Sequence, residues 1–328
     1  MSETQTGAAG AFEEASRAVA MLREQIVRAV VGQDEVIEQV LAAMLAGGHV
    51  LIEGVPGLGK TLLVRALAKT FEGRFARIQF TPDLMPADVT GHTLYDQASG
   101  GFKTRRGPVF TNLLLADEIN RAPAKTQAAL LEVMQEGQVT IEGVPQLLEP
   151  PFMVLATQNP IEQEGTYALP EAQLDRFLLK VRIDYGSVAE ETAMVKRVTG
   201  GQVGDKLNVE AVQTMVKPSA VVAMQKICAS VRLDDQVLDY AVRIARATRS
   251  WGGVSAGAGP RGGIALARIG RAAALMAGRD FVTPEDVKRM ALPALRHRIT
   301  PAPELEIEGQ SSDTILKALL EKVDAPRT

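Results

Sequence analysis

The chain has 328 residues, a length that suits two domains of ordinary size. Hydrophobic residues make up 46% of the sequence and charged residues 23%, which is typical of a folded globular protein and excludes a disordered chain. The formal net charge of -3 disfavours nucleic acid as the main partner, the single Cys228 excludes an internal disulfide, and the three histidines lack metal-ligand spacing.

The N-terminal segment MSETQTGAAGAFEEASR is polar and acidic, unlike the basic and then apolar layout of a secretory signal. No apolar run approaches the roughly 20 residues that crossing a bilayer requires. We therefore expect a cytoplasmic protein without membrane insertion, and we expect residues 1–11 to form a flexible tail.

Up to residue 185 the predicted elements alternate between helices and strands. Apolar residues recur at helical spacing over 12–46, and a break at Val31-Gly32-Gln33 divides this stretch into two helices. Short, nearly all-apolar strands are predicted at 49–53, 75–80, 112–116, 152–157 and 178–183, with helices at 60–71 and 123–136. This alternation indicates an α/β fold with a parallel sheet covered on both faces.

After residue 185 the sequence predicts helices and no further strand. The helices are expected at 188–199, 209–215, 220–231, 235–249, 263–277 and 284–295, and a terminal helix at 311–323. We place the boundary between an α/β domain over 12–185 and a helical domain over 186–328 near Tyr185-Gly186.

The segment GVPGLGKT over 54–61 fits the phosphate-loop pattern G-x-x-x-x-G-K-[ST], and it lies between a predicted strand and a predicted helix. Its glycines allow successive backbone N–H groups to face phosphate oxygens, and the helix N-terminus adds partial positive charge. Lys60 would reach the β- and γ-phosphates of ATP, and the Thr61 hydroxyl would ligate Mg²⁺. The residues predicted to bind the nucleotide here are Gly54, Val55, Pro56, Gly57, Leu58, Gly59, Lys60, Thr61 and Leu62.

A pair of carboxylates follows the apolar run LLLA, at the end of the third predicted strand. Asp117 is placed to hold Mg²⁺, usually through a water, and Glu118 to orient and polarise the attacking water. An acidic pair at a strand end is by itself often only a solvated terminus. Downstream of a phosphate loop, the pair predicts the hydrolytic half of the site.

Two further polar residues are candidates at the same edge of the sheet. Asn159 follows the fourth strand, where its amide would bond a γ-phosphate or the attacking water, or else cap the turn before Pro160. Arg176 precedes the last strand, where it would either insert into a neighbouring subunit's site or pair locally with Asp175 or Glu171. The sequence favours function for Asn159 and leaves Arg176 open.

Several motifs together resemble the MoxR family of AAA+ ATPases, over about residues 31–295. They are the phosphate loop, LLLADEINRAP, LATQNP, EAQLDRF and GPRGG, supported by GHTLYD, GGFKTRRGPVF and EVMQEGQVTIEG. The resemblance implies a nucleotide domain with a five-stranded sheet, a smaller helical lid, and assembly into a ring of identical subunits, typically hexameric.

The resemblance also implies roles for individual residues. Val31, Gly32 and Gln33 match the stretch that borders the adenine. Asn159 matches sensor 1, Arg176 the arginine finger, and Arg261 of GPRGG sensor 2 at the start of a lid helix. With Lys60 and Glu118 these residues form the predicted catalytic set, and Arg121 is an alternative for the role in a neighbouring site.

Two inserts, at about 83–106 and 138–150, resemble those of the branch that contains MoxR, magnesium chelatase and MCM helicases. The second reads as a hairpin around Gly143. By resemblance we expect a chaperone-like remodeller of client protein complexes, working with a partner that carries a von Willebrand factor A domain. A chelatase-like motor for metal insertion is the alternative. A DNA motor is disfavoured, because the second insert has no Lys or Arg, although the first carries Lys103, Arg105 and Arg106.

Overall fold

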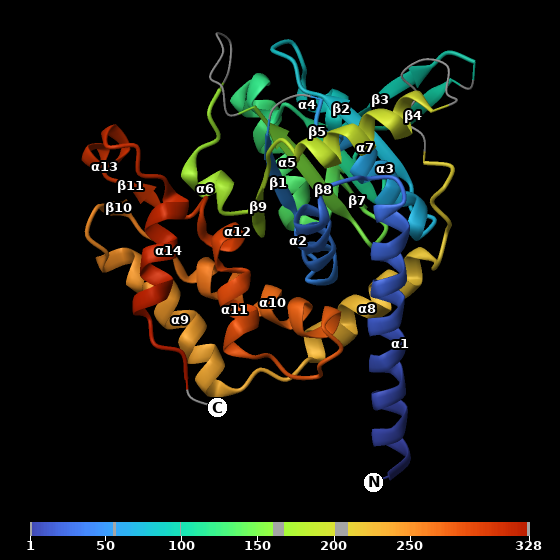
Figure 1. Ribbon diagram of the computed structural model, residues 1–328. Helices are drawn as coiled ribbons and strands as arrows, with labels where there is room; N and C mark the ends of the chain where they lie inside the picture. Colours follow the sequence, from blue (N-terminus) through green and yellow to red (C-terminus); the bar gives the residue numbers. More distant parts are fainter. Residues whose placement is uncertain (1, 55–56, 99, 160–166, 201–208, 327–328) are drawn as a thin grey trace.

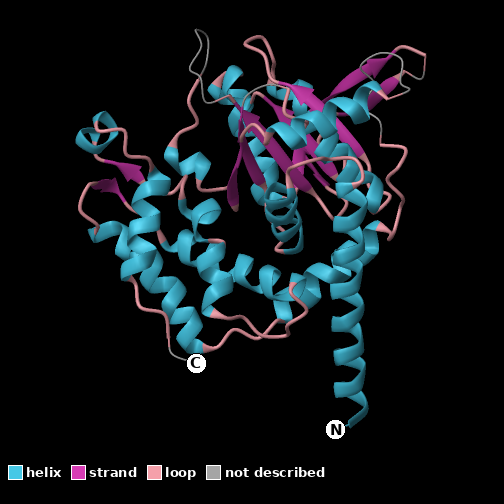
Figure 2. Cartoon of the chain, viewed as in Figure 1, coloured by secondary structure: helices cyan, strands magenta, loops and turns pink. Residues whose placement is uncertain are grey.

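The computed structural model describes residues 2–54, 57–98, 100–159, 167–200 and 209–326. Its centre is a five-stranded parallel sheet between layers of helices (Figures 1 and 2). Across the sheet the strands are β2 (Phe75–Gln79), β5 (Leu113–Asp117), β8 (Met153–Gln158), β1 (Val50–Gly54) and β9 (Leu179–Ile183). The predicted parallel α/β sheet is confirmed, and all of its neighbouring strands pair in parallel.

Alternate residues of the central strands face two different cores. On β1, Val50 and Ile52 pack in the larger core, whereas Leu51 packs in the smaller one on the opposite face. The two-residue period of a strand produces this division, and it explains why the strands read as nearly continuous apolar runs. The larger core is covered by α1 (Ser2–Val27), α2 (Asp34–Leu45) and α3 (Lys60–Thr70), and the smaller one by α5 (Ala124–Glu136).

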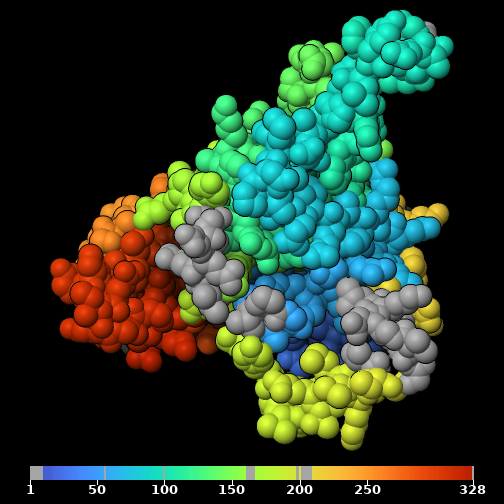
Figure 3. Space-filling view, turned by 90° about the horizontal axis from the view of Figure 1, so that it is seen from above, coloured from blue at the N-terminus to red at the C-terminus, as the bar shows by residue number. Residues whose placement is uncertain are grey.

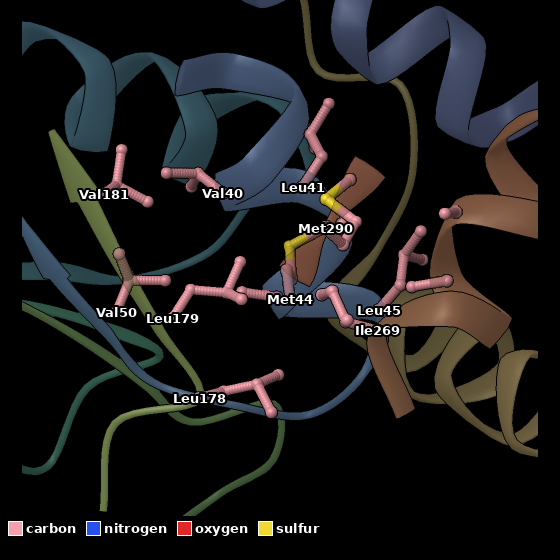
Figure 4. Packing of buried hydrophobic residues seen from close by; sticks show 14 of the residues in the cluster. Val40, Leu41, Met44, Leu45, Val50, Leu178, Leu179, Val181, Ile269 and Met290 are labelled. Carbon is pink, nitrogen blue, oxygen red and sulfur yellow. The ribbon is translucent and has the colours of Figure 1, made fainter. Parts of the chain in front are cut away.

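The C-terminal part of the chain is mainly helical. Its helices are α7 (Val188–Thr199), α8 (Pro218–Ser230), α9 (Asp235–Ser250), α10 (Pro260–Met276), α11 (Pro284–Arg289), α12 (Ala291–Leu295), α13 (Pro303–Ile307) and α14 (Ser312–Lys322). Its buried side chains belong to the same larger core: Met44 and Leu45 of α2 meet Ile269 of α10 and Met290 (Figure 4). The lid is therefore packed on the sheet through one continuous apolar cluster.

Several local predictions differ from the structure. Residues 2–11, expected as a flexible tail, continue α1, because each residue added to an existing helix gains a backbone hydrogen bond. Met290 separates α11 from α12, where one helix over 284–295 was predicted. A short antiparallel pair, β10 (Val254–Ala256) and β11 (Thr300–Pro301), lies in the region where no strand was expected.

The helix predicted at 209–215 does not form. The N–H groups of Met215 and Val216 instead donate to the carbonyl of Thr70, and the Thr214 hydroxyl donates to the carbonyl of Lys69. These contacts satisfy carbonyls at the C-terminus of α3 that have no partner within that helix. Tertiary hydrogen bonding thus replaces the local helix that periodicity suggested.

Both inserts contain hairpins that project from the sheet. The first has α4 (Pro86–Thr90) followed by β3 (Gly91–Asp96) and β4 (Gly101–Arg106), and the second has β6 (Gln138–Ile141) and β7 (Val144–Leu147), as predicted. The two hairpins stand side by side, in teal and green in Figure 3, and Arg106 Nη2 donates to Gln146 Oε1 at 3.5 Å. None of the helices in the described part of the chain combines the length and apolar character needed to span a bilayer.

Candidate active site

The phosphate loop connects β1 to α3 at the carboxyl edge of the sheet. Gly57 has φ 87° and Gly59 has φ 77°, a left-handed conformation that glycine adopts without strain. Gly54 is required for a different reason, because a Cβ there would lie 2.6 Å from the carbonyl oxygen of Ile183 on β9. Val55 and Pro56, also predicted to bind the nucleotide, lie outside the described residues.

Lys60 begins α3 and points back across the loop. Its Nζ donates to the carbonyl of Gly54 at 2.5 Å. Burial lowers the pKa of Lys60, and the negative charges of Asp117 and Glu118 oppose that change. The ammonium group therefore lies between the phosphate loop and the acidic pair, as its predicted role requires.

Asp117, at the end of β5, is held by the two neighbouring strands. Thr157 Oγ1 on β8 donates to Asp117 Oδ1 at 2.6 Å, and Arg77 Nη2 on β2 donates to Oδ2 at 2.6 Å. Arg77 and Thr157 were not identified from the sequence. Knowledge of the strand order would have revealed them, since β2 and β8 flank β5.

Glu118 follows in a left-handed conformation, with φ 56° and ψ 50°. Its backbone N–H donates to Thr157 Oγ1 at 2.9 Å. Its Oε2 accepts from Gln79 Nε2 at 2.9 Å and from Arg121 Nη1 at 3.0 Å. Arg121, the alternative residue for a neighbouring site, is thus paired with Glu118 of its own chain, and Gln79 is a further residue that the sequence did not reveal.

A cavity of about 330 Å³ brings most of the predicted site together. It is lined by Gly57, Gly59, Lys60, Thr61, Leu62, Arg77, Gln79, Asp117, Glu118 and Asn159. A hydroxyl and carboxylates beside a lysine fit Mg²⁺ and a phosphate chain, because Mg²⁺ prefers oxygen ligands and shares them with substrate phosphates. A Cβ at Gly57 or Gly59 would meet no atom within 4 Å, so the loop is not packed against other residues at these two positions.

A second cavity, of about 280 Å³, shares Gly57 with the first and extends beyond the loop. Val31, Gly32 and Gln33 line it together with Leu58, as do residues of the chain that leads into α7. Gln33 Nε2 donates to the carbonyl of Leu58 at 2.8 Å, and its buried Oε1 has no hydrogen-bond partner in the described part of the chain. An acceptor of this kind suits the exocyclic amine of a purine.

Arg176 and Arg261 lie elsewhere, in a third cavity of about 380 Å³ between the sheet and the lid. Arg176 Nη1 donates to Gln135 Oε1, and its buried Nε has no partner among the described residues. Asp175 pairs with Arg298 at 2.7 Å and with Arg261 at 3.8 Å, so the ion pair between Asp175 and Arg176 that the sequence left open does not form. Neither Arg176 nor Arg261 lines the cavity of the phosphate loop in the same chain.

Comparison with known proteins identifies the family. The model of the ATPase family associated with various cellular activities (AAA) matches residues 49–179, and the AAA lid domain matches residues 246–319. Chaperone MoxR1 of Mycobacterium tuberculosis is 42% identical over 92% of this chain and 81% of its own. Protein MoxR of Methylorubrum extorquens is 32% identical over 94% of this chain and 95% of its own.

A solved structure agrees with these sequence matches. A candidate ATPase from Cytophaga hutchinsonii superposes with a TM-score of 0.91 at 41% identity, covering 99% of each chain. The fold, the phosphate loop with its acidic pair, and the matches along nearly the whole chain lead to one conclusion. The chain belongs to the MoxR family of AAA+ ATPases, and it is an ATPase.

Proposed function

We propose that this MoxR-family ATPase works as a ring of identical subunits, hexameric as in the resemblance, with each active site completed by a neighbour. One observation carries the proposal. Lys60 and Glu118 line one cavity, whereas Arg176 and Arg261 line a separate cavity of the same chain. Arginines that act on transferring phosphate must then reach a phosphate loop on a second copy.

In the cavity of the phosphate loop, different groups of the chain bind the phosphates, hold Mg²⁺ and orient the attacking water. Lys60 and the loop amides bind the phosphate chain, and Thr61 and Asp117 would hold Mg²⁺, which neutralises charge that develops on phosphate oxygens. Gln79 and Arg121 fix the Glu118 carboxylate at the cavity wall, where it orients water and accepts its proton. Asn159 lines the same cavity and supplies an amide to the γ-phosphate side.

Mixing two inactive variants tests the shared site. Arg176→Ala and Lys60→Ala rings should each hydrolyse ATP at least about 10²-fold more slowly than wild type, because each lacks a charge on the transferring group. Mixed rings should recover part of the activity, since some sites pair an intact Lys60 with a neighbour's Arg176. The readout is phosphate release against mixing ratio.

Arg232→Ala is the matched control, because Arg232 is a surface arginine that pairs with Asp280 and lines neither cavity. It should be active alone and should not rescue Arg176→Ala beyond simple dilution of the two activities. Ring assembly of both variants is verified by native mass spectrometry. Absence of recovery at every mixing ratio would then rule out that Arg176 acts as an arginine finger in the neighbouring subunit's site.

The work that ATP turnover drives is proposed to be chaperone-like remodelling of client protein complexes, with a partner that carries a von Willebrand factor A domain. The name of the relative Chaperone MoxR1 supports this class of activity. The projecting hairpins support it too: beside their turns they expose Phe102 and Val144, 78% and 55% accessible to solvent, as a client-binding surface would. The cytoplasmic location stays a prediction.

The alternatives have less support. A DNA motor would need free cations on the hairpins, yet Lys103 pairs with Asp96 and Arg106 lies 4.9 Å from the centre of the Phe110 ring. Strands β6 and β7 carry no Lys or Arg. A chelatase-like motor would use the same fold with another partner, so the partner's identity separates it from a chaperone.

A further inference from the structure

A groove in the lid lies open between α9 and α10. It encloses about 530 Å³ and is lined by apolar side chains, of which Leu238, Val242 and Ile264 are 39%, 40% and 56% exposed. Its polar lining consists of Arg246, Arg249, Arg268 and Arg271, and no acidic residue lines it. The groove therefore combines an apolar lining with the positive charge of four arginines.

The groove is continuous with the cavity of Arg176 and Arg261, because Ile264 and Arg268 line both. The Nε of Arg271 is buried in the groove wall without a hydrogen-bond partner in the described part of the chain. A surface that approaches Arg176 and Arg261 from outside thus also covers the groove. That surface must be largely apolar and carry negative charge.

Helix α7 offers such a surface beside the nucleotide cavities. Val188 and Val195 are 83% and 55% exposed, and their seven-residue spacing places them on one face of the helix. Glu191 lies one turn from each, at the border of that face. Figure 3 shows the yellow segment that contains α7 at the edge of the molecule, clear of the lid in red.

The position of α7 relative to the phosphate loop completes the match. Glu191 and Met194 line the cavity that shares Gly57 with the phosphate site, so the adjoining face of α7 borders that cavity. Asp184 lines the same cavity and adds negative charge near the start of α7. Two adjoining cavities thus lie around the phosphate loop. They match the two adjoining hollows on the lid side, namely the cavity of Arg176 and Arg261 and the groove between α9 and α10.

Resting on the intersubunit site proposed above, we infer that the groove between α9 and α10 receives the Val188 and Val195 face of α7 from a second copy of this chain. When Arg176 and Arg261 meet the neighbour's phosphate site, the groove beside them meets the neighbour's α7. The apolar pair packs on the apolar lining of the groove, and Glu191 approaches its arginines. Because α7 also borders the nucleotide cavity, the contact links nucleotide occupancy in one subunit to the lid of the next.

Disulfide trapping tests the contact directly. The only native cysteine, Cys228, is buried, and burial raises the pKa of its thiol to about 12, so the background reaction is low. Chains carrying Val195→Cys are mixed with chains carrying Val242→Cys and oxidised with ATP present. Covalent dimers should form about tenfold faster, or more, than with the control pair Val195→Cys and Ile307→Cys, since docking raises the local thiol concentration.

The control is matched because Ile307 is an exposed apolar residue, 87% accessible, on α13 of the same lid. A chain with both Val195→Cys and Val242→Cys should give a ladder of larger covalent oligomers. Ring-sized particles by native mass spectrometry with equal cross-linking of the two pairs would overturn the docking and leave the ring standing. Active chains that never exceed the monomer mass would overturn both the ring and the docking.

Discussion

The backbone conformation and the hydrogen bonds of Glu118 position its carboxylate in the cavity of the phosphate loop. A left-handed conformation at a residue with a side chain costs on the order of 1–3 kcal/mol, and here φ is 56°. The Thr157 hydroxyl accepts the Glu118 N–H and donates to Asp117, so one side chain stabilises the turn and orients the Asp117 carboxylate. The strained turn directs the Glu118 side chain toward Gln79 and Arg121 at the cavity wall.

At this scale we predict the effect of Glu118→Gln. The amide keeps the volume of the side chain but cannot accept a proton, so kcat for ATP hydrolysis should fall about 10²-fold or more while ATP binding is retained. The control is Glu142→Gln, because Glu142 also has a left-handed φ, 48°, but lies in the turn between β6 and β7. Phosphate release and calorimetric ATP binding measure the two effects, and undiminished turnover in Glu118→Gln would refute the assignment.

At the scale of the elements, the His49 side chain, just before β1, forms hydrogen bonds to β8 and to α5. Its Nδ1 accepts from the Val154 N–H of β8 at 3.0 Å, so its Nε2 carries the proton that bonds the carbonyl of Met134 on α5, also at 3.0 Å. Burial, with a smaller contribution from the charge of Arg268, lowers the pKa of His49 to about 4. The neutral ring is thus part of the joint between β1, β8 and α5.

This joint predicts a dependence of stability on pH. His49 in the unfolded chain binds a proton near pH 6.5, so its contribution is complete above about pH 7 and is lost as the pH falls toward 4. At pH 5 the loss is about 2 kcal/mol of unfolding free energy. His49→Gln should be less stable at pH 7 but should lose less between pH 7 and pH 5. Urea unfolding at both pH values checks this, and equal losses in the two proteins would contradict it.

At the scale of the whole molecule, the lid and the sheet form one body with projecting hairpins. Because the hairpins expose Phe102 and Val144 beside their turns, we expect the tips to contact the client. In a Glu118→Gln background with ATP, the proteins retained from the native cell should be lost with Phe102→Asp but kept with Ile307→Asp.

The two substitutions in that comparison place the same charge on similarly exposed apolar positions, 78% and 87% accessible. ATP binding should be equal in both, which shows that the loss concerns the client. Quantitative mass spectrometry of the retained proteins is the measurement. Equal retention by both variants would show that the hairpin tips are not the client surface.

The sequence alone determined the parallel sheet, the order of its elements along the chain and the phosphate half of the site. Apolar runs such as LLLA and the pattern GVPGLGKT are local, and the chemistry of strands and phosphate loops is written within a few residues. The sequence did not reveal Arg77, Gln79 and Thr157, because each acts on Asp117 or Glu118 from a neighbouring strand. Only the lateral order β2-β5-β8 brings them together.

Tertiary structure also decided where periodicity failed. The segment 209–215 has helical spacing, but backbone N–H groups at its C-terminal end donate hydrogen bonds to the end of α3. Strand β10 pairs with β11, although more than forty residues of chain separate them. Above all, only the fold separated Arg176 and Arg261 from the phosphate loop of their own chain. The residue types of a short segment predict a nucleotide site, because the chemistry of that site is local. Whether two copies share the site depends on distances between segments far apart in the sequence, and only the tertiary structure gives these distances.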